Sequence, residues 1–151
     1  MQFSKLSALS SAIVLALWVV DSGSAAAVAE RDNSYLATAN EIYDWIATTD
    51  ADLTFIGDPI DLTKRAPLNT MVVYCSQRTQ NICGGACTVY NGNARCLNAP
   101  NTNCLRATTN VGFCDRAGCS GSCNQYSSCG TRLDGGFCYT PGTRSINVPF
   151  T

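Results

Sequence analysis

Cysteine is the residue type with the clearest chemistry in this 151-residue chain. Ten cysteines, all after Arg65, lie at Cys75, Cys83, Cys87, Cys96, Cys104, Cys114, Cys119, Cys123, Cys129 and Cys138. An even number of cysteines at this density is typical of a disulfide-stabilised secreted domain, so we expect five disulfide bonds. The spacing does not determine which cysteines pair, because ten cysteines allow many connectivities.

Zinc binding is the alternative chemistry for closely spaced thiols. Two Cys-x3-Cys pairs, Cys83 with Cys87 and Cys119 with Cys123, resemble the ligand pairs of zinc sites. However, the chain has no histidine, and ten thiols exceed what an ordinary site requires. We therefore expect no metal and no cofactor, with the sulfur atoms held in disulfide bonds.

Groups that perform acid, base or nucleophilic chemistry are scarce after Arg65. Residues 66–151 contain no histidine, glutamate or lysine, and their side-chain carboxylates are Asp115 and Asp134. A glycosidase would need both carboxylates at a defined separation around a sugar. Asp134 instead precedes Gly135, as in a turn, and Asp115 stands beside Arg116. We predict that the protein is not an enzyme and has no catalytic residues.

Arginine and aromatic residues make binding the better class of function. Arginine forms planar, two-pronged contacts with carboxylates and phosphates and stacks on aromatic rings. The candidate binding face consists of Arg78, Arg95, Arg106, Arg116, Arg132, Arg144, Tyr90, Tyr126 and Tyr139. Its expected target is an acidic receptor protein, an anionic surface or a polysaccharide. The alternative is that dispersed surface arginines support solubility. Nucleic acid is not expected, because the arginines do not cluster.

The distribution of charge divides the chain in two. Residues 30–63 carry eight carboxylates and one arginine, a net charge of −7, whereas residues 66–151 carry six arginines and two aspartates, a net charge of +4. The pair Lys64 and Arg65 stands at this boundary, which is also where the cysteines begin. We predict a processing site there, separating an acidic propeptide (30–65) from a mature ten-cysteine domain (66–151). The alternative is a chance dibasic pair on a surface loop.

The first 29 residues have the pattern of a secretory signal peptide. Lys5 is followed by an apolar run from Leu6 to Val20 and then by small residues that fit a cleavage site, Ala25-x-Ala27 or Ala27-x-Ala29. The run is shorter than the ~18–20 residues that a membrane span requires. We therefore expect a secreted, extracellular protein without a transmembrane anchor. This agrees with the oxidising route that disulfide bonds need.

The acidic segment predicts one short helix followed by an extended piece. Between residues 33 and 50, apolar side chains recur at helical spacing, with Asn33 and Ser34 as capping candidates. Residues 51–62 indicate a short strand that is broken at Gly57 and Pro59. A single helix and strand cannot form a core, so we expect this propeptide to rest on the domain that follows, in cis. Opposite charges favour that contact, and the propeptide would shield the basic face and assist folding.

The ten-cysteine domain is predicted to be small, disulfide-rich and mainly β, with short strands and hairpins. Strands are expected at residues 70–75, 110–114 and 144–148. The strongest hairpin signal is Asn91-Gly92, and Asp134-Gly135 predicts a second hairpin over residues 132–139.

A weak internal repeat divides the ten cysteines into two sets of five. Each set opens with an aromatic residue before cysteine, Tyr74-Cys75 or Phe113-Cys114, and continues with a Cys-x3-Cys pair that encloses small residues. Five is an odd number, so with full oxidation at least one disulfide must join the halves.

The order of these segments resembles fungal small secreted cysteine-rich proteins with a propeptide removed by a kexin-type protease. The resemblance to uncharacterised secreted proteins of basidiomycete fungi covers most of residues 70–148, in CGGACTVYNGNARCLNAPNTNC and VGFCDRAGCSGSCNQYSSCGTRLDGGFCYTPGT. Adjacent cysteine pairs, as in hydrophobins, and a late Cys-x-Cys, as in defensin-like proteins, do not occur. The resemblance implies an effector-like or toxin-like protein acting on host or competitor cells, and it transfers no active site. A cell-wall or polysaccharide-binding module is the alternative.

Overall fold

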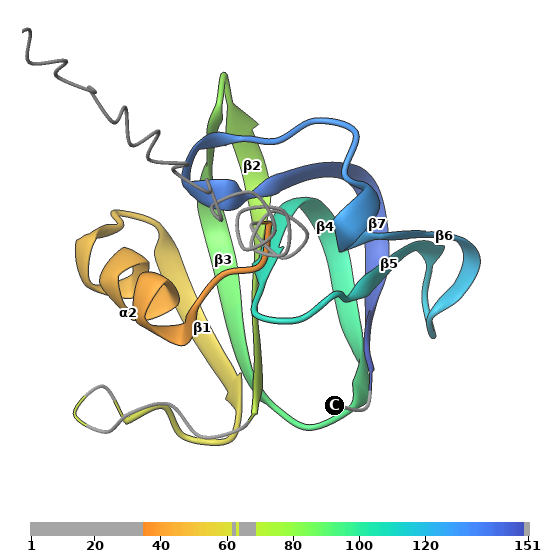
Figure 1. Cartoon of the computed structure of the whole chain (residues 1–151). Coiled ribbons are helices and arrows are strands. Elements are labelled where there is room, and N and C mark those ends of the chain that lie inside the picture. Colours follow the sequence, from red (N-terminus) through yellow and green to blue (C-terminus); the bar gives the residue numbers. More distant parts are fainter. Residues whose placement is uncertain (1–34, 62, 64–68, 150–151) are drawn as a thin grey trace, which may run out of the picture.

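The computed structural model describes residues 35–61, 63 and 69–149, which form one seven-stranded sheet with one helix (Figure 1). Residues 1–29 and the pair Lys64 and Arg65 lie outside the described residues, so the signal peptide and the processing site stay predictions. The described elements are α2 (Ala39–Thr48), β1 (Asp52–Gly57), β2 (Thr70–Thr79), β3 (Ile82–Gly92), β4 (Arg95–Ala107), β5 (Gly112–Arg116), β6 (Ser120–Gln125), η1 (Tyr126–Ser128), η2 (Asp134–Gly136) and β7 (Cys138–Val148). The prediction of a mainly β, disulfide-rich domain is confirmed.

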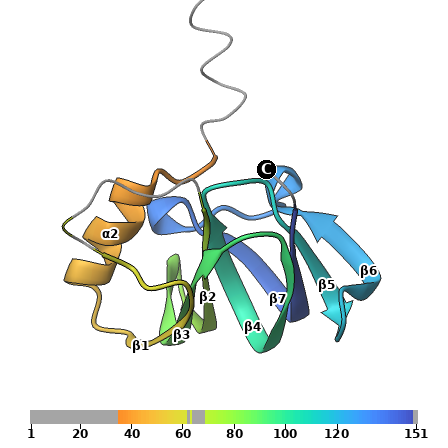
Figure 2. The ribbon, with the colours of Figure 1, turned by 90° about the horizontal axis from the view of Figure 1, so that it is seen from below.

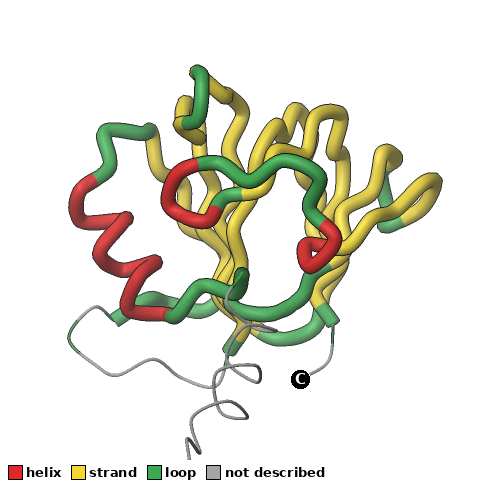
Figure 3. Tube along the Cα trace, turned by 45° about the horizontal axis from the view of Figure 1, so that its top comes forward, coloured by secondary structure: helices red, strands yellow, loops and turns green. Residues whose placement is uncertain are grey.

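The sheet has the strand order β1-β3-β2-β4-β7-β5-β6. Strand β2 is central in the first half, and its residues from Thr70 to Cys75 are buried on both faces. This explains why its sequence is an almost continuous apolar run rather than an alternating one. Figure 2 shows α2 beside the β1–β3 end of the sheet, with β5 and β6 at the opposite end. Figure 3 shows that α2 and the two 3-10 turns lie on the same side of the sheet.

The hairpin predicted at Asn91-Gly92 is wrong. Strands β3 and β4 are not neighbours, because β2 lies between them, and Asn91 stands within β3 opposite Met71. Gly92 is needed for close packing rather than for a turn, since a Cβ atom there would collide with the Tyr90 hydroxyl group. That hydroxyl donates a hydrogen bond to the Asn93 carbonyl at 2.6 Å and so holds the connection to β4.

The hairpins that form are the ones joining β2 to β3 and β5 to β6. The first turns at Gln80 and Asn81, where Gln80 has a positive φ of 55°. The predicted Asp134-Gly135 turn does form, as η2, with Gly135 at φ 69°. However, only a single bridge between Arg132 and Cys138 flanks this turn, so the predicted second pair of strands is not formed there.

The two halves of the ten-cysteine domain share one topology. In each half the first strand lies in the middle, flanked by the second and third, which gives the orders β3-β2-β4 and β6-β5-β7. The third strands, β4 and β7, pair antiparallel with Thr102 opposite Thr143. A twofold rotation about that pair exchanges Leu97↔Ile146 with Leu105↔Cys138, and both pairs are present. The repeat seen in the cysteine pattern therefore has a counterpart in the sheet.

All ten cysteines are paired, which confirms the predicted five disulfides. The bonds are Cys75–Cys87, Cys83–Cys104, Cys96–Cys119, Cys114–Cys123 and Cys129–Cys138. Cys96–Cys119 is the bond between the halves that the odd number of cysteines in each half requires. Cys75–Cys87 and Cys114–Cys123 each join directly opposite residues of the first and second strand of a half, so they are equivalent under the twofold relation.

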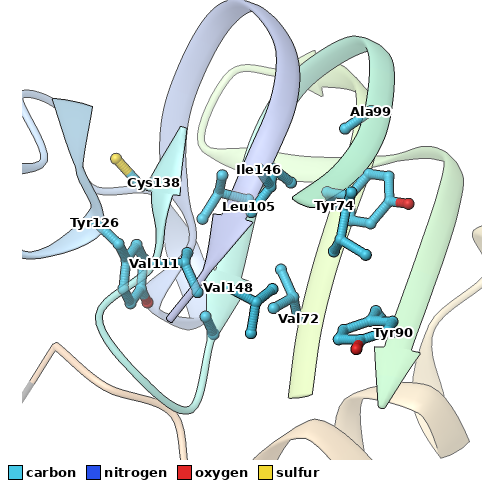
Figure 4. Close-up of a cluster of buried hydrophobic side chains, with 12 residues drawn as sticks. Val72, Tyr74, Tyr90, Ala99, Leu105, Val111, Tyr126, Cys138, Ile146 and Val148 are labelled. Carbon is cyan, nitrogen blue, oxygen red and sulfur yellow. The ribbon is translucent and has the colours of Figure 1, made fainter. Parts of the chain in front are cut away.

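Buried side chains form two clusters on opposite faces of the sheet. One contains Val72, Tyr74, Leu105 and Ile146, and Figure 4 shows these residues together on one side of the strands. The other lies under α2 and contains, from the sheet and the η2 turn, Met71, Val73, Cys75, Cys83, Cys87, Val89, Cys104, Leu133 and Phe137. Since side chains alternate along a strand, Arg106 projects from β4 on the same side as Cys104.

The predicted helix and strand of the acidic segment are confirmed, but the predicted cap is wrong. The helix begins at Ala39, so its N-cap is Thr38 rather than Asn33 or Ser34, which lie outside the described residues. Thr38 and Glu41 form a capping box, in which each side chain bonds to the other residue's backbone N–H. Strand β1 ends at Gly57, as predicted, and adds to the edge of the sheet parallel to β3.

Candidate functional site

The described part of the acidic segment, residues 35–61, is called here the N-terminal segment, and it covers one face of the ten-cysteine domain. Its Ile42 is completely buried and Ala37 is 5% exposed, both in the cluster with Met71 and Val73. The Trp45 ring lies 5.4 Å from the Phe137 ring. The sheet residues and the η2 turn beneath it, namely Met71, Val73, Cys75, Cys83, Cys87, Val89, Cys104, Arg106, Leu133 and Phe137, are called the covered face.

Backbone hydrogen bonds hold the N-terminal segment before α2 and along β1. Strand β1 pairs with β3 from Asp52 opposite Ala86 to Gly57 opposite Asn91. The Ala37 N–H donates to the Ala107 carbonyl at 2.9 Å, and the Asp58 N–H donates to the Asn91 carbonyl at 2.7 Å. As a result, the outer edge of β3 is occupied by this segment.

Arg106 is the cation of the covered face. The residue is 8% exposed, and its Nη2 atom lies 3.3 Å from Oε1 of Glu41, in the N-terminal segment. Its Nε atom is buried without a hydrogen-bond partner among the described residues. Gly136 packs against the guanidinium group so closely that a Cβ atom there would lie 3.4 Å from Nε. A buried cation is costly unless it is paired, and the partner of this one comes from the N-terminal segment.

Glu41 is ionised at neutral pH. The backbone N–H of Thr38, which donates to the carboxylate at 2.7 Å, is the main reason why the pKa of Glu41 is lowered, and the Thr38 hydroxyl and Arg106 lower it further. Desolvation acts in the opposite direction but does not prevail. The capping box therefore also holds the charge that faces Arg106.

Two further arginines stack on tyrosine rings. The Arg132 guanidinium group lies 4.5 Å from the Tyr126 ring centroid and 5.4 Å from that of Tyr35, and it donates to the Tyr126 carbonyl at 2.7 Å. The Tyr126 hydroxyl donates to the Tyr35 carbonyl at 2.8 Å, so Tyr126 also contacts the N-terminal segment. Arg78, near the end of β2, stacks on the ring of Tyr139 in β7, with its guanidinium carbon 4.2 Å from the ring centroid.

The nine residues of the predicted binding face do not form one face. Tyr90 and Tyr126 are 3% and 0% exposed, so they are core residues, and burial raises the pKa of both hydroxyl groups. Arg106, Arg132 and Tyr126 lie near the N-terminal segment. The exposed residues Arg95, Arg116 and Arg144 belong to three different strands, β4, β5 and β7.

The sequence contained a signal for Arg106 that spacing arguments missed. Arg106 stands between Leu105 and Ala107, and an arginine inside an apolar strand is expected to need a nearby anion. Its partner, Glu41, could not be identified from spacing, because the two residues are far apart in the chain.

A polar hollow lies over the pseudo-twofold centre of the sheet. It consists of two adjoining cavities of about 270 Å³ each, which share Ser76, Asn101 and Thr102. Asn103 and Arg144 line one of them, and Thr88 and Asn98 line the other. An apolar cavity of about 370 Å³ lies elsewhere, between α2 and the end of β1.

Within residues 35–61, 63 and 69–149, no set of three or more metal-ligating side chains is grouped. No helix in this part of the chain is long and apolar enough to cross a membrane. Comparison with known proteins found no matching family model, no matching curated protein and no matching solved structure.

Proposed function

We propose that the chain is a secreted precursor whose ten-cysteine domain, residues 66–151, is a non-enzymatic interaction protein, effector-like or toxin-like, that acts on host or competitor cells. The observation that carries this proposal is the N-terminal segment itself, which covers an apolar face and supplies the anion for its buried cation. This arrangement is expected of a precursor whose binding face stays covered until the chain is cut at Lys64-Arg65.

Covalent structure supports release of the segment. All five disulfides lie within residues 75–138, so no cross-link would hold the N-terminal segment after a cut at Lys64-Arg65. The domain that is left keeps its own cluster around Val72 and Leu105 as well as its disulfides. Five disulfides are compatible with a protein that folds in an oxidising compartment.

The carboxylates of the domain support a function in binding rather than catalysis. Asp115 accepts a hydrogen bond from the Ser122 N–H at 2.9 Å and so holds the β5–β6 hairpin. Asp134 begins the exposed η2 turn. Each carboxylate therefore has a structural place on a different element, which supports a role in holding the fold.

The test is the intact mass of the natural secreted product, before and after reduction. The expected product starts at Ala66, or just after Pro67, and gains ten hydrogen atoms on reduction, two for each disulfide. Purified product should affect host or competitor cells, whereas the uncut precursor should not. A product that retains Glu41 to Asp61 in the same polypeptide would disprove the proposal.

The polar hollow favours a second candidate, a polysaccharide-binding module of the cell wall. Amide and guanidinium groups from the exposed residues Asn101 and Arg144 are suited to the hydroxyl groups of a sugar. In this case chitin or β-glucan should deplete the product from solution, and Asn101→Ala or Arg144→Ala should reduce the depletion. Arg116→Ala, which removes an exposed arginine away from the hollow, is the matched control.

A further inference from the structure

We propose that the covered face is the partner-binding surface of the ten-cysteine domain, and that the partner is a protein whose extended segment pairs in parallel with β3 and places a carboxylate against Arg106. This inference rests on the proposed function, because the face becomes accessible only when the N-terminal segment leaves. It names the class of partner, an acidic polypeptide, from the chemistry of the surface.

The edge of β3 selects a polypeptide. In the described sheet β3 has two neighbours, β2 and β1, and β1 belongs to the N-terminal segment. Its departure leaves the outward-facing N–H and C=O groups of β3, those of alternate residues between Ala86 and Asn91, without strand partners, while the inward-facing groups stay paired with β2. An open edge of this kind pairs with an extended peptide, and backbone hydrogen bonds provide much of the affinity. Neither a lipid surface nor a glycan can reproduce this ladder.

Arg106 selects an acid. Among the described residues its ion pair is with Glu41, and its Nε atom remains unsatisfied even in that pair. Arg106 is 8% exposed while the segment is in place, and once Glu41 leaves, this cation would stand on an apolar face without its counter-charge. A carboxylate from a partner relieves that cost, and a neutral segment does not.

The apolar part of the covered face determines which residues must lie next to that acid in the partner. In the N-terminal segment Glu41 is followed by Ile42, which is completely buried against the covered face, and Trp45 reaches Phe137 one turn later. A partner must therefore carry apolar side chains next to its acid. The net charge of +4 on residues 66–151 adds a long-range attraction for an acidic partner.

The first experiment asks whether the face is available and specific for this chemistry. A full-length chain, oxidised and carrying a recognition site for a sequence-specific protease directly after Arg65, is cut and separated from its N-terminal part. The probe is a labelled synthetic peptide of residues 35–61, and binding is followed by fluorescence anisotropy. The peptide is expected to bind the cut domain and not the uncut chain. A cut domain that loses its near-ultraviolet circular dichroism, or that neither releases nor exchanges its segment, overturns the proposal.

Variants of the peptide separate the two recognition elements without altering the domain. Glu41→Gln should weaken binding by about threefold or more, whereas Asp44→Asn, an equal loss of charge on the exposed side of the same helix, should weaken it less than about twofold. Replacing both Thr54 and Phe55 by proline should weaken binding of the peptide at least about tenfold. Alternate residues of a strand bond to the same neighbour, so one of these two N–H groups must donate to β3, and proline has no N–H to donate. Equal effects of Glu41→Gln and Asp44→Asn would contradict the proposed role of Arg106.

The second experiment asks whether foreign segments use the same surface. A displayed library of random peptides is selected on the cut domain, with prior removal of peptides that bind the uncut chain. Selected peptides are expected to carry an acid beside an apolar residue, to compete with peptide 35–61, and to bind Arg106→Lys better than Arg106→Gln. Peptides that lack an acid, or binding of anionic phospholipid vesicles without peptide binding, overturn the proposal. The mass of the natural product is unaffected by either result, so failure here is distinct from failure of the proposed function.

Discussion

At the scale of single residues, the ion pair between Glu41 and Arg106 links the N-terminal segment to the ten-cysteine domain. Arg106 is buried and Glu41 is about half exposed, with 52% of its side chain accessible. Removing the Glu41 charge alone leaves Arg106 without a counter-charge on an apolar face. Removing both charges would therefore lower the stability of the fold less than removing one. The energy of this contact therefore depends on whether Glu41 is ionised.

We predict that Glu41→Gln lowers the stability of the full-length chain at neutral pH but not at low pH. Glutamine preserves the capping box, so the difference reports the charge. Because the pKa of Glu41 is lowered in the folded protein, its stabilisation is complete well above the ordinary value of 4.5 and is lost as the pH falls through the lowered pKa. Thermal unfolding of both proteins at neutral pH and at an acid pH well below 4.5, where Glu41 is protonated, measures this.

Asp44→Asn is the control for that prediction, since it removes the same charge from an exposed position of α2. Its effect on the melting temperature should be small at both values of pH. A loss of stability from Glu41→Gln that is equally large in acid would mean that the side chain acts through packing rather than through its charge.

Burial of the N-terminal segment predicts a second contrast between equivalent substitutions. Ile42→Ala should lower the free energy of unfolding by about 2–4 kcal/mol, because it opens a cavity at a completely buried site. Ile82→Ala removes the same atoms from a side chain that is 63% exposed, so its effect should stay within about 0.5 kcal/mol. Denaturant unfolding of the oxidised, full-length variants measures both. Equal effects would show that the segment does not pack as described.

At the scale of elements, helix α2 depends on its first turn. The Thr38 side chain accepts a hydrogen bond from the Glu41 N–H at 3.2 Å, and its backbone N–H donates to the Glu41 carboxylate. Thr38→Ala should destabilise the precursor by about 1 kcal/mol, as is usual for loss of an N-cap. Thr48→Ala, which removes only a hydroxyl bonded to the Asp44 carbonyl, should cost less. Circular dichroism during denaturant unfolding compares the two.

Local sequence predicted which segments form strands better than it predicted which strands pair. The apolar run over residues 70–75 became strand β2, and the acidic segment formed the predicted helix and strand, although its N-cap is Thr38 rather than Asn33 or Ser34. Asn91-Gly92 misled because Gly92 serves the packing of Tyr90 rather than a turn. The actual turn at Gln80-Asn81 contains no glycine. The positive φ at Gln80 is therefore imposed by the pairing of β2 with β3.

At the scale of the whole molecule, the cysteine count predicted more than the cysteine spacing did. Parity required a disulfide between the halves, and Cys96–Cys119 is that bond. The remaining connectivity depends on which strands are neighbours, which spacing cannot give. Spacing also could not show that Tyr90 and Tyr126 are core residues, because their polar tips are typical of binding faces while the fold buries both rings. Only Arg106, flanked by apolar residues, carried a local sign of its position.

The closed and open forms of the molecule should differ in which disulfides a reductant reaches. Cys96 and Cys123 are exposed, so Cys96–Cys119 and Cys114–Cys123 should be reduced first in the full-length chain. Cys75–Cys87 and Cys83–Cys104 should be reduced last, because their four residues are at most 5% exposed and lie on the covered face.

Loss of the N-terminal segment should remove that protection selectively. In the cut domain we expect Cys75–Cys87 and Cys83–Cys104 to be reduced markedly faster, while Cys96–Cys119, which lies away from the covered face, keeps its rate. Timed reduction with a phosphine, alkylation and peptide mapping of both forms measure all five bonds in one experiment. Unchanged rates for the two covered disulfides would show that the segment does not shield that face, whereas a general acceleration of all five would indicate that the domain opens as a whole when the segment departs.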